Sequence, residues 1–188
     1  MLKELILSNR CCRRFDEQVK IEKQTLVQLV DLARLSASSA NLQPLKYYLS
    51  WEKENNQLIF PHLAWAGYLP DWPGPEQGER PAGYIIILLD TGIARKTECD
   101  QGIAAQSILL GAREKGLAGC IIGSIKRRVL AEQLGLLKEH EILLVIALGK
   151  PREKAVLEQV QAGDIKYWRD QEGIHHVPKR ALEEIIVS

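Results

Sequence analysis

The stretch "YIIILLD", residues 84–90, is an almost unbroken apolar run rich in β-branched isoleucine. A short run of this kind is typical of a strand that is buried on both faces. Residues 100–119, "DQGIAAQSILLGAREKGLAG", follow with the spacing of a helix, and Gly102, Ala104 and Ala105 near its start allow close packing against another backbone. We therefore predict a sheet that lies between layers of helices.

Hydrophobic periodicity extends this interpretation to both sides of the core. Helices are predicted at residues 2–8, 21–37 and 125–136, and strands at 46–51, 56–61, 120–123 and 141–149. Residues 63–83 are rich in Pro, Gly and Trp and are expected to form a long loop with a functional role. Residues 167–188 are expected to form a turn-bearing tail and a closing amphipathic helix. This order of elements predicts one α+β domain over residues 1–188.

Composition narrows the classes of function. The chain has 25 basic and 24 acidic residues, so it lacks the basic excess that is typical of a nucleic-acid binder. Its four cysteines include no CxxC pair, so the spacing of structural zinc and of thioredoxin-like redox sites is missing. Neither a signal peptide nor an apolar run long enough for a membrane span is visible. We expect a soluble, cytoplasmic protein without nucleic-acid or membrane partners.

The stretch "NRCCRRF", residues 9–15, concentrates positive charge in an otherwise balanced chain, which favours a small anionic ligand over a polymer. Arg10, Arg13 and Arg14 could grip a phosphate through paired N–H groups. Arginines in loops are more often solvated, and this alternative stays open from the residues alone. The two adjacent cysteines have poor geometry for a disulfide and supply only two metal ligands, so we expect them to be small side chains first and reactive thiols second.

Two further loops carry polar groups that could meet a ligand. In "SASSANLQP", residues 36–44, the amides of Asn41 and Gln43 join several hydroxyls, which suits hydrogen bonding to a polar heteroaromatic edge. Capping and turn chemistry explains the serines well but Gln43 poorly. In "CIIGSIKRR", residues 120–128, a glycine and a serine bring backbone N–H groups to the surface, as an ordinary strand–helix turn also does.

The stretch "HHVPKR", residues 175–180, contains two adjacent histidines that suggest a metal site. Neighbouring side chains of an extended segment point to opposite faces, and the other two histidines lie far away in the sequence. We therefore expect no bound metal. Lys179 and Arg180 form a second cationic pair before the last predicted helix, which suits an anion or is ordinary surface charge.

Taken in order, these stretches resemble the nitroreductase family of flavin enzymes nearly end to end. Members open with an Arg-x-Ser-x-Arg-x-Phe-like signature and continue one helix later with Ser-x-x-Asn-x-Gln-Pro. A helix with an aspartate, small residues and a glutamine follows a buried strand, a glycine turn follows the next strand, and a basic pair precedes the last helix. The matching residues are Arg10, Cys11, Arg13, Phe15, Ser38, Asn41, Gln43, Pro44, Gly123, Lys179 and Arg180, with the helix "DQGIAAQSILLGAREKGL".

The resemblance implies a homodimer with FMN at the subunit interface, a central mixed, mostly antiparallel β-sheet flanked by helices, and an exchanged C-terminal tail. Basic side chains from both ends of the chain would grip the phosphate and the ribityl–pyrimidine side of FMN. Polar groups of residues 36–44 would hydrogen-bond the flavin, and backbone at the end of the strand 120–123 would lie near its reactive edge. The implied cofactor-binding residues are Arg10, Cys11, Arg13, Ser38, Asn41, Gln43, Ile122, Gly123, Lys179 and Arg180.

The activity that the resemblance implies is that of an FMN-dependent NAD(P)H oxidoreductase. Flavin N5 would accept a hydride from NADH or NADPH and then reduce a small-molecule acceptor, such as a nitroaromatic or a quinone, by a ping-pong mechanism. No catalytic side chain is required. Residues 63–83 would form a substrate lid with Trp65, Tyr68 and Trp72 available for stacking, or these aromatics would only pack together.

Two alternative functions share the bound flavin. Related branches of the family remove halogens from aromatic rings, fragment flavin or oxidise peptide heterocycles, and a non-catalytic flavin-binding protein would not oxidise NAD(P)H. The chain departs from the family pattern at Cys11, where members usually carry a serine, and a thiol is a poorer hydrogen-bond partner than a hydroxyl. The resemblance therefore predicts the cofactor and leaves the acceptor open.

Overall fold

The structure is a computed structural model that describes residues 1–187, and its helices and strands alternate along most of the chain. The helices are α1 (Leu2–Ser8), α2 (Lys23–Arg34), α3 (Lys53–Ile59), α4 (Asp100–Glu114), α5 (Arg127–Gln133) and α6 (Leu182–Ile185), with 3₁₀ turns η1 (Ser39–Asn41) and η2 (Phe60–His62). The strands are β1 (Phe15–Asp16), β2 (Leu45–Ser50), β3 (Gly83–Asp90), β4 (Ala118–Ile122), β5 (His140–Pro151), β6 (Ala155–Gln159), β7 (Trp168–Arg169) and β8 (His175–Lys179).

Strand β3 lies inside the main sheet, as its apolar run predicts. It pairs antiparallel with β2 on one side and with β5 on the other, so that Ile86 lies between Tyr48 and Val145. The other side of β5 pairs antiparallel with β4 and with the two-residue β1. A mostly antiparallel sheet flanked by helices confirms the predicted α+β class.

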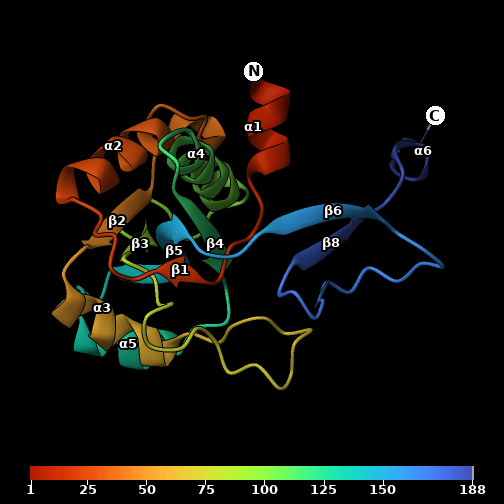
Figure 1. Cartoon of the computed structure of the whole chain (residues 1–188). Helices are drawn as coiled ribbons and strands as arrows, with labels where there is room; N and C mark the ends of the chain where they lie inside the picture. Colours follow the sequence, from red (N-terminus) through yellow and green to blue (C-terminus); the bar gives the residue numbers. More distant parts are fainter. Residues whose placement is uncertain (188) are drawn as a thin grey trace.

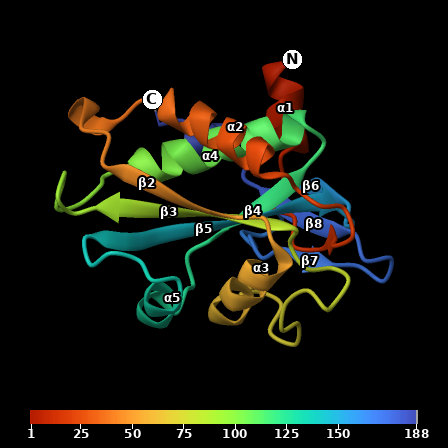
Figure 2. The same cartoon turned by 90° about the vertical axis from the view of Figure 1, so that its left-hand side faces the viewer.

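Helices cover both faces of this sheet (Figure 2). Helices α2 and α4 pack on one face against Ile85 and Ile87, and helices α3 and α5 pack on the opposite face, which includes Tyr84 and Ile86. Successive side chains of a strand point to opposite faces, so β3 is buried from Gly83 to Leu89. Within the described residues, the sheet therefore separates two large hydrophobic cores, and a small third cluster is formed by Cys12, Phe15 and Ala118.

The contact between α2 and α4 is close because α4 presents small residues to α2. A Cβ added at Gly111 would lie 2.2 Å from Cδ1 of Leu32 and 3.1 Å from Cδ2 of Leu29, so a larger residue would force these side chains of α2 to shift. Ala104 and Ala105 are buried in the same core, which confirms the expectation for these residues. Gly102 is exposed, with open space around an added Cβ, and takes no part in this packing.

After β5 the chain continues into a tail, residues 153–187, that contains a second sheet. Strand β8 pairs parallel with β6 and antiparallel with β7. The tail projects from the body of the molecule, and α6 lies at its far end (Figure 1). No residue of α6 is buried within the described chain. Nothing in residues 1–187 forms a helix both long and apolar enough to span a membrane.

The predicted strand at residues 56–61 is wrong, because these residues end α3 and form η2. The side chain of Asn56 accepts a hydrogen bond from Ser50 Oγ at 2.7 Å and donates one to the Ala82 carbonyl at 2.9 Å. These bonds fix the helix against the sheet. Ile59 is the buried residue of α3, and one buried position is too little for periodicity to separate a helix from a strand.

The predicted helices at residues 2–8, 21–37 and 125–136 are confirmed as α1, α2 and α5, with shorter bounds for the last two. The tail is more regular than predicted, because it contains β7 and β8, and its closing helix has only four residues. These strands are short, and β8 pairs with β6 across a long loop. No pattern within a short stretch of sequence predicts that β6 and β8 pair across this loop.

Candidate functional site

The arginine loop, residues 9–14, runs beside the start of β4. Cys11 forms a parallel bridge with Gly119, and the backbone N–H of Cys12 donates to the Gly119 carbonyl at 3.0 Å. A Cβ on Gly119 would lie 2.3 Å from the Ala147 carbonyl oxygen of β5, so glycine is needed here for the close approach of β4 to β5. The arginine loop is therefore fixed against the sheet just beyond the C-terminal end of α4.

Within residues 1–187, the side chains of Arg10 and Arg13 have no acidic partners. Arg10 donates from Nη2 to the Ile6 carbonyl at 2.5 Å, and its buried Nε has no hydrogen-bond partner in the described chain. Arg14 differs, because its Nε and Nη2 bind Glu79 at 2.7 and 2.5 Å. This pair raises the pKa of Arg14 and lowers the pKa of Glu79. Arg14 is thus a structural residue, whereas Arg10 and Arg13 are suited to an anion.

The Arg13 side chain rests on the tail. Its Nη1 lies 3.4 Å from Nε2 of His175, and its guanidinium carbon lies 4.9 Å from the centre of the Tyr167 ring. A cation over an aromatic face is attracted by the negative face of the ring. Within the described residues the other guanidinium nitrogens of Arg13 make no hydrogen bond, so these donors are available to a ligand.

The two adjacent cysteines differ in burial. Cys12 is buried, and its thiol donates to the Arg14 carbonyl at 3.2 Å. Burial raises the pKa of Cys12 to about 12, so its thiol stays protonated and unreactive at neutral pH. Cys11 is exposed at the surface of the arginine loop. The geometry therefore makes Cys12 a packing residue and leaves Cys11 accessible.

The polar loop, residues 36–43, is anchored to the first residue of α4. The buried carboxylate of Asp100 accepts hydrogen bonds from Ser38 Oγ at 2.5 Å and from the Ser39 backbone N–H at 3.1 Å. Ser38 Oγ also accepts a bond from the Gln43 backbone N–H at 2.9 Å. A hydroxyl has one proton, so the donor of Ser38 is already used inside the chain. A carboxylate at a helix N-terminus is further favoured by the helix dipole.

The polar loop also stores backbone strain. Ala40, Asn41 and Gln43 have φ values of +48°, +54° and +52°. This left-handed conformation costs a non-glycine residue about 1–2 kcal/mol. Strained residues of this kind cluster at ligand sites. The Gln43 amide donates to the Asn41 carbonyl at 3.2 Å, and a cavity of about 150 Å³ lies beside Ser38 and Gln43. The polar loop therefore has a defined shape next to a small cavity.

Ile122 and Gly123, at the end of β4, differ in what they offer a ligand. The Ile122 side chain is buried in the core, so only its backbone is available. Gly123 is exposed, and its carbonyl accepts a hydrogen bond from Arg127 Nη2 at 3.0 Å. The nearest atom to a Cβ placed on Gly123 would be Leu144 Cδ2 at 4.0 Å. Packing within the chain does not require glycine here, and the open space fits a ligand close to the backbone.

Trp65, one of the three predicted lid aromatics, is a packing residue in this structure. Its ring centre lies 5.7 Å from that of Phe60, and a Cβ on Gly74 would approach its indole to 2.5 Å. The side chain packs against the core on the α3 and α5 face of the sheet. Trp65 therefore contributes to the base of the 63–83 segment.

The other two lid aromatics contact the tail. Tyr68 is exposed, and its ring centre lies 5.0 Å from that of Tyr167. Trp72 lies under the Arg169 guanidinium, whose carbon is 4.2 Å from the indole centre. Because Tyr167 also lies under Arg13, the predicted lid and the arginine loop meet at the tail.

In one chain the two loops lie at opposite ends of α4. The arginine loop contacts Gly119 beyond the C-terminal end, and the polar loop contacts Asp100 at the N-terminal end. A helix of 15 residues is about 22 Å long. Lys179 ends β8 and Arg180 follows it, shortly before α6 begins at Leu182, so both lie apart from the polar loop and toward the end of the tail that carries α6. Figure 1 shows α6 at the far end of the tail. A single chain thus does not gather the predicted cofactor-binding residues into one site.

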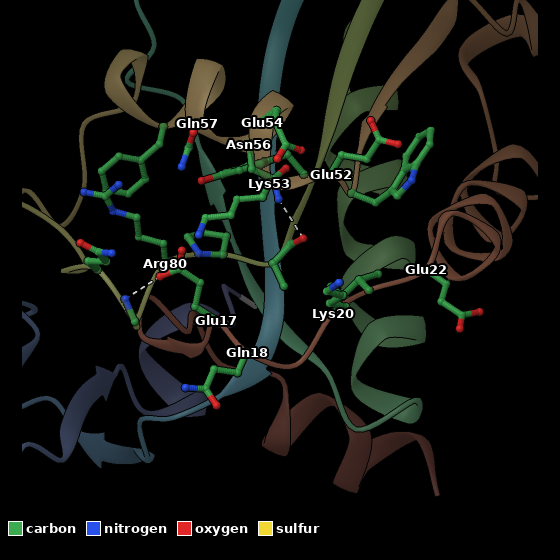
Figure 3. A pocket seen from close by; sticks show the side chains of 18 residues that line it. Glu17, Gln18, Lys20, Glu22, Glu52, Lys53, Glu54, Asn56, Gln57 and Arg80 are labelled. Carbon is green, nitrogen blue, oxygen red and sulfur yellow. Dashed lines mark hydrogen bonds between the residues drawn. The ribbon is translucent and has the colours of Figure 1, made fainter.

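A larger cavity, of about 810 Å³, lies away from both loops between residues 17–22, 51–60 and 77–84 (Figure 3). Charged side chains of both signs surround it, including Glu17 and Arg80 (Figure 3). None of the predicted cofactor-binding residues and none of the three lid aromatics lines this cavity, but residues 77–82 at the end of the predicted lid contribute to its wall. The cavity is therefore distinct from the two loops.

His175 and His176 point to opposite faces of β8. His175 is buried beside Arg13, whereas His176 binds Glu158 at 2.9 Å and Asp170 at 3.1 Å. In residues 1–187 no group of three or more His, Cys, Asp or Glu side chains is arranged to hold a metal ion.

Sequence reasoning missed the residues that hold the two loops in place. Asp100 anchors the polar loop, and an acidic residue at the start of a helix was an available signal. Glu153 accepts a hydrogen bond from the Arg13 backbone N–H across 140 positions of sequence. No local pattern connects residues so far apart.

The nitroreductase family model matches residues 6–150 of this chain. A nitroreductase family protein from Streptococcus pneumoniae TIGR4 aligns over 100% of both chains, with a TM-score of 0.71 and 16% identity. An FMN-dependent nitroreductase from Clostridium difficile R20291 aligns over 80% of this chain and 87% of its own, with a TM-score of 0.63 and 21% identity. The NADPH:FMN oxidoreductase from Vibrio harveyi, complexed with NAD+, aligns over 80% and 68%, with a TM-score of 0.61 and 24% identity. At these identities the likeness shows a shared fold.

Proposed function

Because the chain belongs to the nitroreductase family, we propose that it is an FMN-dependent oxidoreductase that takes electrons from NADH or NADPH and passes them to a nitroaromatic, a quinone or a similar acceptor. The observation that carries this proposal is the pair of loops at the ends of α4. The arginine loop offers guanidinium groups that have no acidic partner in the described chain. The polar loop offers a strained polar surface. Two of the structures it resembles are named for FMN.

The residues present fit FMN. Arg10 and Arg13 would hold its phosphate and its pyrimidine side through charge-assisted hydrogen bonds. The buried Nε of Arg10 is a donor that such an anion would satisfy. Asn41 and Gln43 would hydrogen-bond the polar edge of the flavin, and Gly123 leaves space for the ring beside the backbone.

Two of the predicted contacts take a modified role in this proposal. Ser38 would act by shaping the polar loop, since its proton is donated to Asp100. Cys11 stands at the position of the serine in the family signature and would meet the phosphate side with a weaker donor.

When bound, FMN supplies the redox chemistry, as a hydride acceptor toward NAD(P)H and an electron donor toward the second substrate. The side chains bind it, orient it and set its electrostatic surroundings. The positive charge of Arg13 would favour the reduced cofactor, which is more negative on its pyrimidine side. Tyr68 and Trp72 would cover the ring and exclude water around the acceptor.

A second copy of the chain would complete the site. The two loops would meet across the dimer, and Lys179 and Arg180 would reach the partner's FMN from the projecting tail. The exposed apolar side chains of α6 and its neighbour support this arrangement, because Leu182, Ile185 and Ile186 are 63%, 61% and 58% exposed in one chain. We therefore propose a homodimer with an exchanged C-terminal tail.

The test is the visible spectrum of the purified protein after FMN is added and the free cofactor is removed. Flavin absorbance that stays with the protein and bleaches on anaerobic addition of NADH or NADPH supports the proposal. A protein that retains no FMN would contradict both cofactor and activity. Bound FMN that neither donor bleaches would favour a non-catalytic flavin-binding protein.

The acceptor is tested in the second half-reaction. Rapid reoxidation of the bleached protein by a nitroaromatic or a quinone supports the proposed substrate class. Reoxidation only by halogenated aromatics or peptide heterocycles would place the protein in a related branch of the family.

A further inference from the structure

The tail lies beyond residues 6–150 that the family model matches, yet it makes the contacts that hold Arg13. We propose that the tail positions the Arg13 guanidinium toward the flavin, with Glu153 fixing the backbone and His175 and Tyr167 fixing the side chain. This inference rests on the proposed function, in which Arg13 faces FMN.

Glu153 fixes the backbone of the arginine loop. Its side chain is only 1% exposed, and its Oε1 accepts hydrogen bonds from the backbone N–H groups of Arg13 and, at 3.2 Å, Arg14. Its Oε2 accepts a bond from Arg169 Nη2 at 2.8 Å. A buried carboxylate is tolerated when its oxygens are hydrogen-bonded and its charge is paired. One side chain of the tail therefore sets the conformation of two consecutive residues of the loop.

His175 and Tyr167 hold the side chain of Arg13. Because a guanidinium only donates, Nε2 of His175 is the acceptor in their 3.4 Å contact, and the ring proton lies on Nδ1. That Nδ1 is buried and has no partner in the described chain. Burial also lowers the pKa of His175 to about 4, which keeps the ring neutral and able to accept. A buried donor without a partner lowers the stability of the fold. A histidine at position 175 is therefore better explained by its contact with Arg13 than by a contribution to stability.

The tail residues that hold Arg13 also contact the predicted lid, residues 63–83. The Tyr68 backbone N–H donates to the Tyr167 hydroxyl at 3.4 Å, and Trp72 lies under Arg169, which is bound to Glu153. The cation of the arginine loop and the aromatics of residues 63–83 thus rest on one set of tail residues. A substitution in the tail should therefore disturb Arg13 even where it touches no ligand.

The test compares His175→Leu with His175→Gln, whose amide oxygen can still accept a hydrogen bond from Arg13. The two readouts are the FMN dissociation constant, from fluorescence quenching, and the two-electron midpoint potential of the bound flavin. His175→Leu is expected to weaken FMN binding at least fivefold. It is also expected to weaken the binding of reduced FMN up to tenfold more than the binding of oxidised FMN. Such a change lowers the two-electron midpoint potential by about 30 mV. His175→Gln should restore most of both values.

His176→Gln is the matched control, because His176 is the adjacent residue and points away from Arg13. It should bind FMN within twofold of the unaltered protein, at an unchanged potential. Tyr167→Leu provides a second variant in case His175→Leu does not fold, and it should weaken FMN binding two- to fivefold. Tyr167→Phe keeps the aromatic face under Arg13 but loses the hydroxyl that Tyr68 binds, so it should lose less FMN affinity than Tyr167→Leu.

Unaltered affinity and potential in folded His175→Leu and Tyr167→Leu proteins would overturn the positioning role. Equal losses in His175→Leu and His176→Gln would also overturn it, because they would indicate a general effect of the tail. Failure of the unaltered protein to bind FMN would overturn the proposed function instead, so the two failures are distinguishable.

Discussion

The two loops at the ends of α4 are built in opposite ways. The polar loop takes its shape from neighbouring groups, since Asp100 binds Ser38 and Ser39 while left-handed residues form the turn. Two guanidinium groups of the arginine loop have no acidic partner among the residues that the structure describes, and the shape of this loop depends on Glu153 in the tail.

This difference indicates that the two loops have different roles. The polar loop is anchored by a buried charge, so changes at its anchor should mainly lower the stability of the fold. The arginine loop has spare donors, so loss of one of them should mainly weaken the binding of an anionic ligand.

The largest effect is expected at the anchor of the polar loop. Asp100→Ala should lower the free energy of unfolding by about 2–3 kcal/mol, because two hydrogen bonds to a buried charge are lost and their donors remain. Urea denaturation measures this change. Glu98→Ala removes an exposed carboxylate two positions earlier and should leave the midpoint unchanged. An Asp100 variant as stable as the unaltered protein would remove the basis for an anchored polar loop.

A substitution in the arginine loop should weaken FMN binding more than it lowers the stability of the fold. Arg13→Ala is expected to raise the FMN dissociation constant about 10- to 30-fold, which corresponds to about 1.5–2 kcal/mol for a charge-assisted contact. Its urea midpoint should fall less than that of Asp100→Ala, because one weak contact to the His175 Nε2 acceptor is lost and no carboxylate loses a partner. Arg34→Ala, at an exposed ion pair of α2, should change neither value. A clear loss of stability with normal FMN binding would reverse the roles proposed for the two loops.

The sheet could be predicted from sequence because its signal is local. The isoleucine run of β3 and the spacing of α4 each indicate a buried element within one short stretch. Helix α3 was missed because its single buried residue, Ile59, gives no periodicity.

The arginine cluster and the polar loop were also readable as candidate sites, because unusual residue types stand close together in each. Residues 175–180 of the tail were readable as a candidate site in the same way, but the contacts of Glu153 and His175 with Arg13 were not, since they join residues 140 and 162 positions apart. Long-range packing decides their roles, and no pattern within a window of sequence records it.

A smaller effect is expected from relieving strain in the polar loop. Ala40→Gly should raise the free energy of unfolding by about 0.5–1 kcal/mol, because glycine accepts the positive φ of this position without a steric penalty. Ala131→Gly, inside helix α5, should lower it by about 1 kcal/mol. Chemical denaturation measures whether the free energy of unfolding rises or falls in each of the two variants. A destabilised Ala40→Gly protein would show that the left-handed turn is not strained.

The smallest effect is a pH dependence that should have opposite signs at the two adjacent histidines. Burial holds the pKa of His175 at about 4, below its ordinary 6.5, so the unfolded chain binds more protons between these values and stability falls on acidification. His175→Gln should remove about 0.5 kcal/mol of the loss between pH 7 and pH 6.

At His176, hydrogen bonds that the ring donates to Asp170 and Glu158 raise the pKa, so this residue stabilises the fold at low pH and the contribution is lost as pH rises through the raised pKa. His176→Gln should therefore steepen the loss of stability on acidification. Urea midpoints at pH 7 and pH 6 measure both variants, and equal slopes in the two would contradict the assigned environments.

A mixed dimer tests most directly whether the flavin site is shared between two chains. One chain carries Arg13→Ala, the other carries Asn41→Ala with Gln43→Ala, and two different affinity tags isolate the dimer that contains both. We predict one tightly bound FMN per mixed dimer, because one of its two sites then has every group intact, and no tightly bound FMN in either parent homodimer. Mixed dimers without a tight site would contradict a shared site and place both loops of each site in one chain.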